Sequence, residues 1–147
     1  MHPSDAPAIL QATYPATPGG LAQLLVEFDQ LSPSTRWGEQ LAYSARLTLE
    51  ELAVNAVNHG GQTAPDRWIA VSVSECAESL IVVVEDPGRP FDPTQRPSPV
   101  TDASLNDREP GGLGIMFIKK LAHSLHYQRI GGVNRTTALL SRKSTDV

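Results

Sequence analysis

Cysteine is almost absent from this sequence of 147 residues, in which Cys76 is the only one. A single thiol excludes an intrachain disulfide, and together with four scattered histidines it makes no metal-ligand spacing. Disulfide-stapled secreted scaffolds and structural zinc domains are therefore excluded, and we expect a reducing, cytoplasmic environment.

Positive charge and long apolar runs are also scarce. The formal net charge is -4 and the isoelectric point is near 5.5, which gives no general attraction to nucleic acid or to anionic lipid. The longest aliphatic run, 80–84, is far shorter than the ~20 residues that span a bilayer, and residues 1–7 lack the pattern of a signal peptide. We therefore expect neither nucleic acid nor a membrane as a partner.

The composition is that of a folded globular chain. Hydrophobic residues make up 40% and charged residues 19%, and a chain of this length can bury about two-thirds of its unfolded surface. No repeat or low-complexity tract divides it. We expect a single domain over residues 1–147.

Apolar periodicity predicts three helices and five strands. A turn at Pro18-Gly19-Gly20 precedes a one-faced helix over 21–28, the longest helix covers 37–59 and ends at Gly60-Gly61, and a short one covers 113–122. The predicted strands are 8–14 at a sheet edge, an antiparallel pair at 68–74 and 80–84, the second buried on both faces, and a hairpin of 126–130 with 135–140.

Four polar residues lie on one stripe of the longest helix. Their spacing is i, i+4, i+7 and i+8, and they are Glu51, Asn55, Asn58 and His59. A solvated helix face is the simplest interpretation, but Asn and His cost helix propensity there. An Asn oxygen is a neutral, hard ligand suited to a Mg²⁺ that shares its other sites with water and phosphates.

The acidic end of the aliphatic strand is a second candidate. Asp86 can accept a hydrogen bond from an exocyclic amine, and Gly88 lets the backbone approach a flat ring. An ordinary β-turn is the alternative, because Asp, Pro and Gly are common turn residues.

Glycines at 111–114 form the third candidate, since they open a predicted helix whose N–H groups can hold phosphate oxygens. A flexible hinge is the alternative. The proline-rich segment at about 93–111 has no periodicity, which predicts a mobile lid. The sequence has neither G-x-x-x-x-G-K-[ST] nor G-x-G-x-x-G after a strand, so a nucleotide would bind by another scheme.

In order and spacing, these segments resemble the boxes of the GHKL ATPase superfamily, which includes gyrase and the histidine kinases. Residues 49–60 resemble its N box, Asp86-Pro87-Gly88 its G1 box, and Gly112-Leu113-Gly114 its G2 box. Asn134-Arg135-Thr136-Thr137 resembles the strand that closes the adenine pocket. The short length and the D-x-G-x-P-F-D form look like bacterial anti-sigma-factor serine/threonine kinases.

The resemblance implies an α+β fold, a two-layer α/β sandwich in which helices cover one face of a mixed, mostly antiparallel sheet. It implies Asn55 as the Mg²⁺ ligand, Asp86 on the adenine amino group with Gly88 at the ring, and Glu51 as general base. Arg108, in the lid, is a candidate for a γ-phosphate contact. The other expected cofactor residues are Asn58, His59, Gly112, Leu113, Gly114 and Thr137.

The implied function is a kinase that uses Mg-ATP to phosphorylate a serine or threonine of an anti-sigma-factor antagonist and that also sequesters a sigma factor, with a homodimer as a further expectation. A histidine kinase is disfavoured, because Pro90 replaces a second G1 glycine and no phosphoacceptor-histidine helix pair is present. The alternative is a regulatory module that binds ATP and a partner without phosphorylating it.

Overall fold

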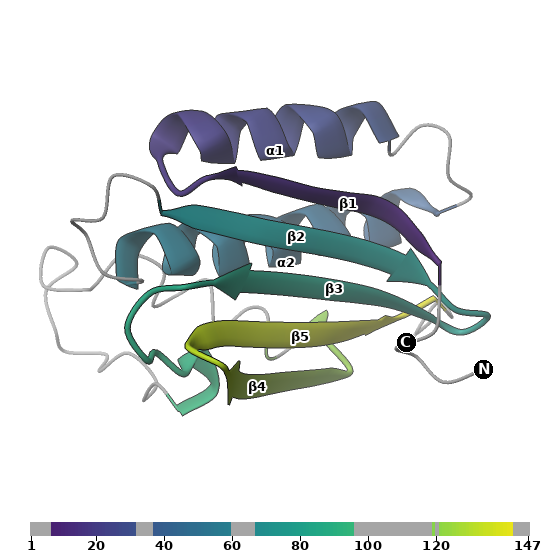
Figure 1. Ribbon diagram of the computed structural model, residues 1–147. Coiled ribbons are helices and arrows are strands. Elements are labelled where there is room, and N and C mark those ends of the chain that lie inside the picture. Colours follow the sequence, from purple (N-terminus) through teal and green to yellow (C-terminus); the bar gives the residue numbers. More distant parts are fainter. Residues whose placement is uncertain (1–6, 32–36, 60–66, 96–118, 120, 143–147) are drawn as a thin grey trace, which may run out of the picture.

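The computed structural model describes residues 7–31, 37–59, 67–95, 119 and 121–142. Within these residues, two helices lie against one five-stranded sheet (Figure 1). In chain order the elements are β1 (Ala8–Pro15), α1 (Pro18–Leu31), α2 (Glu39–His59), β2 (Trp68–Glu75), β3 (Ser79–Asp86), a 3-10 turn (Pro93–Gln95), β4 (Ser124–Ile130) and β5 (Val133–Ser141).

The strand order is β1-β2-β3-β5-β4, and every pairing in the described part of the chain is antiparallel. The predicted α+β sandwich is confirmed, as are the edge position of β1 and the pairings of β2 with β3 and of β4 with β5. The expectation of a short helix over 113–122 falls almost wholly outside the described residues.

The turn predicted at Pro18-Gly19-Gly20 is wrong, because these residues form the first turn of α1. Thr17 caps the helix: its hydroxyl oxygen accepts a hydrogen bond from the Gly20 N–H at 3.0 Å. Proline is favoured at the first helical position, where its missing N–H costs nothing. At Gly20 a Cβ would lie 1.8 Å from the carbonyl oxygen of Pro15, so only glycine lets α1 start this close to β1.

The core lies between the helices and one face of the sheet. Leu49 of α2 and Phe28 of α1 are fully enclosed, and the Phe28 ring stacks on Trp37 at 5.9 Å between centroids. All residues from Leu80 to Val84 are buried, which confirms the prediction that β3 is buried on both faces. This central strand carries Asp86 at its end, so the packing of β3 positions that carboxylate.

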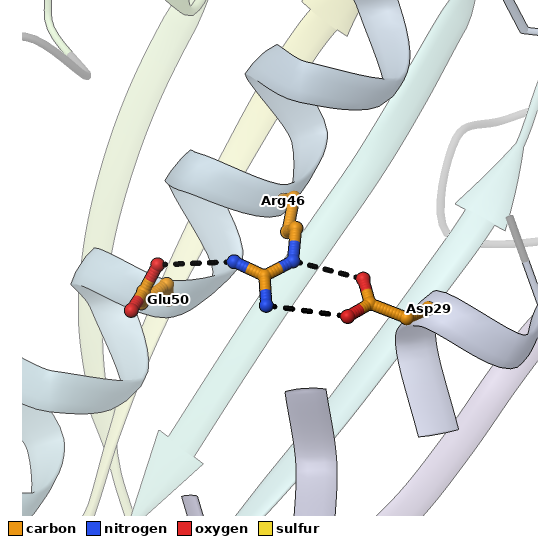
Figure 2. Close-up of polar contacts among 3 residues, drawn as sticks. All are labelled: Asp29, Arg46 and Glu50. Carbon is orange, nitrogen blue, oxygen red and sulfur yellow. Dashed lines mark hydrogen bonds and ion pairs between the residues drawn. The ribbon is translucent and has the colours of Figure 1, made fainter. Parts of the chain in front are cut away.

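A surface ion pair joins the two helices. Figure 2 shows Arg46 of α2 between Asp29 of α1 and Glu50, one turn further along α2. Its guanidinium donates to both carboxylate oxygens of Asp29, at 2.8 and 3.2 Å, and lies 3.4 Å from Glu50 Oε1. The side chains are about half exposed, so the ion pair contributes little to stability, about 0–1 kcal/mol.

Candidate functional site

A pocket lies where α2, the end of β3 and the start of β5 meet. Strand alternation explains its composition, because the residues of β3 and β5 that face the helices continue from apolar core positions into polar ones. The lining residues are Leu52, Asn55, Ala56, Val84, Asp86, Phe91, Pro93, Asn134 and Thr136.

Asn55 presents an unsatisfied oxygen in this pocket. The residue is 2% exposed, and its Nδ2 donates to the backbone carbonyl of Glu51 at 2.9 Å, one turn earlier in α2. Its Oδ1 is buried and has no hydrogen-bond partner in the part of the chain that the structure describes. A buried, unpaired amide oxygen costs free energy unless a ligand satisfies it, so Asn55 remains a candidate ligand-binding residue.

Asp86 is the acidic group of the pocket. It is 6% exposed, and its Oδ1 accepts hydrogen bonds from the Gly88 N–H at 2.8 Å and from Asn134 Nδ2 at 3.2 Å. Burial raises the pKa of Asp86, while these two donors and the positive charges of Arg67 and Arg129 act in the opposite direction. Gly88 therefore contributes its backbone N–H to holding the carboxylate.

The threonine of β5 that lines the pocket is Thr136, whereas Thr137 was expected near the cofactor. Thr136 is buried and lines the pocket, and Thr137 is only partly buried and pairs with Val83 in the neighbouring strand. Successive residues of a strand point to opposite faces, so Thr137 lies on the face turned away from the helices. The sequence pattern could have given this register, because Thr136, Ala138 and Leu140 occupy every second position and therefore lie on the same buried face of β5.

The rest of the α2 stripe lies around the pocket rather than in it. Glu51 is half buried, outside the lining residues, and its pKa is raised by burial and by the neighbouring charge of Glu50. The His59 ring stacks on Phe91, 4.3 Å between centroids and nearly parallel, so His59 supports one pocket wall. Asn58 is partly buried next to it.

The sequence analysis gave no individual role to two polar residues, although it placed the first, Asn134, in the strand segment resembling the one that closes the adenine pocket. Asn134, 3% exposed, joins β5 to the loop after β3 through several hydrogen bonds. Arg67 donates from Nη2 to the carbonyl oxygens of Ala56 and Val57, at 2.9 and 3.3 Å, which satisfies the C-terminal end of α2. No sequence motif predicts either role, because both roles depend on contacts between segments that are distant in the sequence.

The expected phosphate-binding residues Arg108, Gly112, Leu113 and Gly114, and the lid at 93–111 apart from its first residues, lie outside the described residues. Across the described ranges, no group of three His, Cys, Asp or Glu residues could hold a metal ion.

Comparison with known proteins agrees with this geometry. The family described as the histidine kinase-like ATPase domain matches residues 14–141, almost the whole chain. The chain belongs to the histidine kinase-like ATPase family. This confirms the resemblance to GHKL proteins, and family membership implies that the chain binds ATP.

Among curated proteins, this ATPase domain is similar to the serine/threonine-protein kinase BtrW of Bordetella bronchiseptica, 31% identical over 102 residues that cover 69% of this chain and 72% of the relative. Among solved structures it is similar to the RsbU and RsbW domains of a Mycobacterium tuberculosis protein, with a TM-score of 0.61, 17% identity and 94% of this chain covered. The chain spans 34% of that structure's chain.

A blue-light activated histidine kinase of Erythrobacter litoralis matches with a TM-score of 0.53 and 17% identity, covering 83% of this chain and 59% of that one. At these identities the two structures show the fold alone. Within the described residues, no helix is both long and apolar enough to cross a membrane. The single domain over 1–147 stays a prediction.

Proposed function

We propose that this ATPase domain is a protein serine/threonine kinase that binds Mg-ATP and phosphorylates an anti-sigma-factor antagonist, and that it sequesters a sigma factor. The observation that carries the proposal is the Oδ1 of Asn55, which is buried without a partner among the described residues, in a pocket that also contains Asp86. The Asn55 oxygen fits a hard cation such as the Mg²⁺ at the phosphate end of Mg-ATP. The Asp86 carboxylate fits the exocyclic amine at the adenine end. The similarity to the kinase BtrW supports the choice of a protein hydroxyl as acceptor.

The bound nucleotide would be held at both ends. Asn55 would provide the protein ligand to Mg²⁺, and Asp86 would accept a hydrogen bond from the adenine amino group next to Gly88 and Thr136. When bound, Mg²⁺ neutralises charge on the phosphates. The expected contacts of Asn58, His59, Arg108, Gly112, Leu113, Gly114 and Thr137 belong to the same proposal, although Thr137 lies on the outer face of β5.

Glu51 is the proposed general base. The acceptor hydroxyl oxygen bonds to the γ-phosphorus, the bond from that phosphorus to the bridging oxygen breaks, ADP leaves, and the hydroxyl proton passes to the Glu51 carboxylate. The raised pKa of Glu51 makes it a stronger base than an exposed glutamate. Its neighbour Glu50 points instead to Arg46 (Figure 2), which gives a matched control one residue away.

The test is single-turnover transfer of labelled phosphate from ATP to an anti-sigma-factor antagonist that carries a serine or threonine acceptor. Glu51→Gln should keep nucleotide affinity and lose roughly 10²- to 10⁴-fold in transfer rate. Glu50→Gln should retain transfer. Asn55→Ala should weaken Mg-ATP binding first and transfer as a result. A Glu51→Gln protein that transfers at the wild-type rate would contradict the base assignment.

The position of Glu51 outside the pocket lining favours a second candidate, a regulatory module that binds ATP and a partner without phosphorylating it. In that case no antagonist would be labelled, and only Asn55→Ala would alter nucleotide-dependent partner binding. Co-purification of the partner with and without Mg-ATP separates the two functions. The same preparation gives the oligomeric state, for which we propose a homodimer.

A further inference from the structure

Asn134 uses every hydrogen-bonding atom of its side chain. Its Nδ2 donates to Asp86 Oδ1 at 3.2 Å and to the carbonyl oxygen of Arg89 at 2.7 Å. Its Oδ1 accepts from the Phe91 N–H at 3.4 Å, from Arg129 Nη1 at 2.9 Å and from the Tyr127 hydroxyl. Backbone and guanidinium donors lie at Oδ1 and carboxylate and carbonyl acceptors lie at Nδ2, so a flipped amide would keep at most the bond to the Tyr127 hydroxyl, which can also accept.

These bonds connect three separate segments. Asp86, Arg89 and Phe91 belong to the end of β3 and the loop after it, which Asn134 ties to β5. Tyr127 and Arg129 come from β4, the edge strand, and Arg129 Nη1 also donates to the Gly88 carbonyl oxygen at 2.9 Å. A buried amide on one segment that is satisfied by partners from two others holds all three in one relative position, because moving any one would leave polar groups unpaired.

The consequence for Asp86 is that its two oxygens differ. Both hydrogen bonds made to Asp86 by described residues end on Oδ1, from Gly88 and from Asn134. With Oδ1 engaged, the carboxylate is held against rotation and Oδ2 remains as the available acceptor. An acceptor held in place favours the exocyclic amine of adenine over the exocyclic carbonyl of guanine, which has no hydrogen to donate.

We propose that Asn134, supported by Arg129, is a positioning residue that sets the base specificity of this pocket. The inference rests on the proposed ATP site, and it assigns the preference for adenine to the orientation of Asp86 rather than to the presence of a carboxylate alone. Loss of the Asn134 bonds lets the carboxylate turn and the loop after β3 relax, so the pocket accepts a guanine ring with less penalty.

The experiment compares the dissociation constants of Mg-ATP and Mg-GTP by calorimetry for wild type and four variants. Asn134→Leu keeps similar size and removes all the bonds, and Arg129→Gln removes the charge at an exposed site. Arg135→Gln is the control, because it also removes one arginine charge. Arg135 follows Asn134 in β5 and forms an ion pair with Glu85 on the opposite face of the sheet. Arg129→Lys tests for rescue by a conservative change.

The quantity measured is the ratio of GTP to ATP dissociation constants. We expect Asn134→Leu to lower it by about tenfold, the scale of one hydrogen bond to a charged group, and Arg129→Gln to lower it several-fold. Arg129→Lys should recover part of the loss and Arg135→Gln should match wild type. If Asn134 had only a structural role, its loss would weaken the binding of ATP and of GTP equally and leave the ratio of their dissociation constants unchanged.

The outcomes distinguish this inference from the function beneath it. A wild-type protein that binds neither nucleotide refutes the proposed ATP site and the inference with it. A wild-type protein that prefers ATP, together with an unchanged ratio in Arg129→Gln and in any folded Asn134→Leu, refutes the inference alone. Because Arg129 is exposed, its variant decides the question even if Asn134→Leu does not fold.

Discussion

Replacing Asp86 by Asn is expected to separate stability from nucleotide affinity. The side chain keeps its size, and its remaining oxygen can still accept from the Gly88 N–H and from Asn134 Nδ2. Burial raises the pKa of Asp86 above its unfolded value, so the folded state disfavours the charged form at neutral pH. That cost is present above the folded pKa and is relieved as the pH falls through it. The Asn variant removes the cost at every pH.

The expected stability change is therefore zero or positive at pH 7, whereas the affinity for ATP should fall. Asn exchanges a charged acceptor for an amide, and a hydrogen bond to a charged group contributes about 1.5–3 kcal/mol. The Kd for Mg-ATP should rise about 10- to 150-fold, since each 1.4 kcal/mol is a factor of ten.

Thermal unfolding by calorimetry and titration with Mg-ATP are the two assays. Asp92→Asn is the matched control, because Asp92 accepts from the backbone and hydroxyl of Thr94 and lies outside the pocket lining. It should leave ATP affinity near wild type. If Asp86→Asn unfolds several degrees earlier and binds ATP normally, the carboxylate is a structural group and the adenine assignment is wrong.

Three further predictions test the fold and the pocket. Gly20→Ala should destabilise the protein by about 1–3 kcal/mol in urea unfolding, because the new Cβ would overlap the Pro15 carbonyl. Gly19→Ala is the control: its Cβ would make only an ordinary contact with Thr17, so this change should stabilise the protein by about 0.4–1 kcal/mol. In the same assay, Leu49→Ala should lower the free energy of unfolding by about 2–5 kcal/mol, because the Leu49 side chain is fully buried. Arg46→Met should lower it by less than about 1 kcal/mol, because Arg46 belongs to an exposed ion pair. Wild-type affinity for ATP should decline on acidification at a higher pH than an exposed aspartate would cause, because the pKa of Asp86 is raised and protonation removes an acceptor; a flat profile down to pH 4 would contradict this.

The elements with strong periodicity were predictable from sequence, and the polar contacts between them were not. Helix α2 contains no proline and is followed by a glycine pair that signals its end. The aliphatic stretch of β3 predicts a strand at the centre of the sheet, where both faces are buried. The start of α1 was misjudged because Pro18-Gly19-Gly20 suits a turn as well as a capped helix start, and the choice depends on Thr17 and on the approach to β1.

Within the site, motif spacing brought Asn55 and Asp86 together correctly, because one sits on the helix and the other at the strand end that it covers. The motif alone gave no register for β5, and reading the alternation back from Leu140 would have selected Thr136 instead of Thr137. Asn134 could not be assigned in advance. Its partners come from β4 and from the loop after β3, and their convergence exists only in the folded chain.

The position of β5 in the sheet also bears on how the chain folds. It is the last described strand in sequence, yet it lies between β3 and β4, and Asp86 pairs with Asn134 across a long intervening segment. Pairing so distant in sequence is slow to form, because the loop must close before any contact compensates for its entropy. The pocket therefore exists only in chains whose β5 has docked. ATP at 100 times its Kd would stabilise the state with β5 docked by about 2.7 kcal/mol and would not stabilise a chain that lacks this pocket.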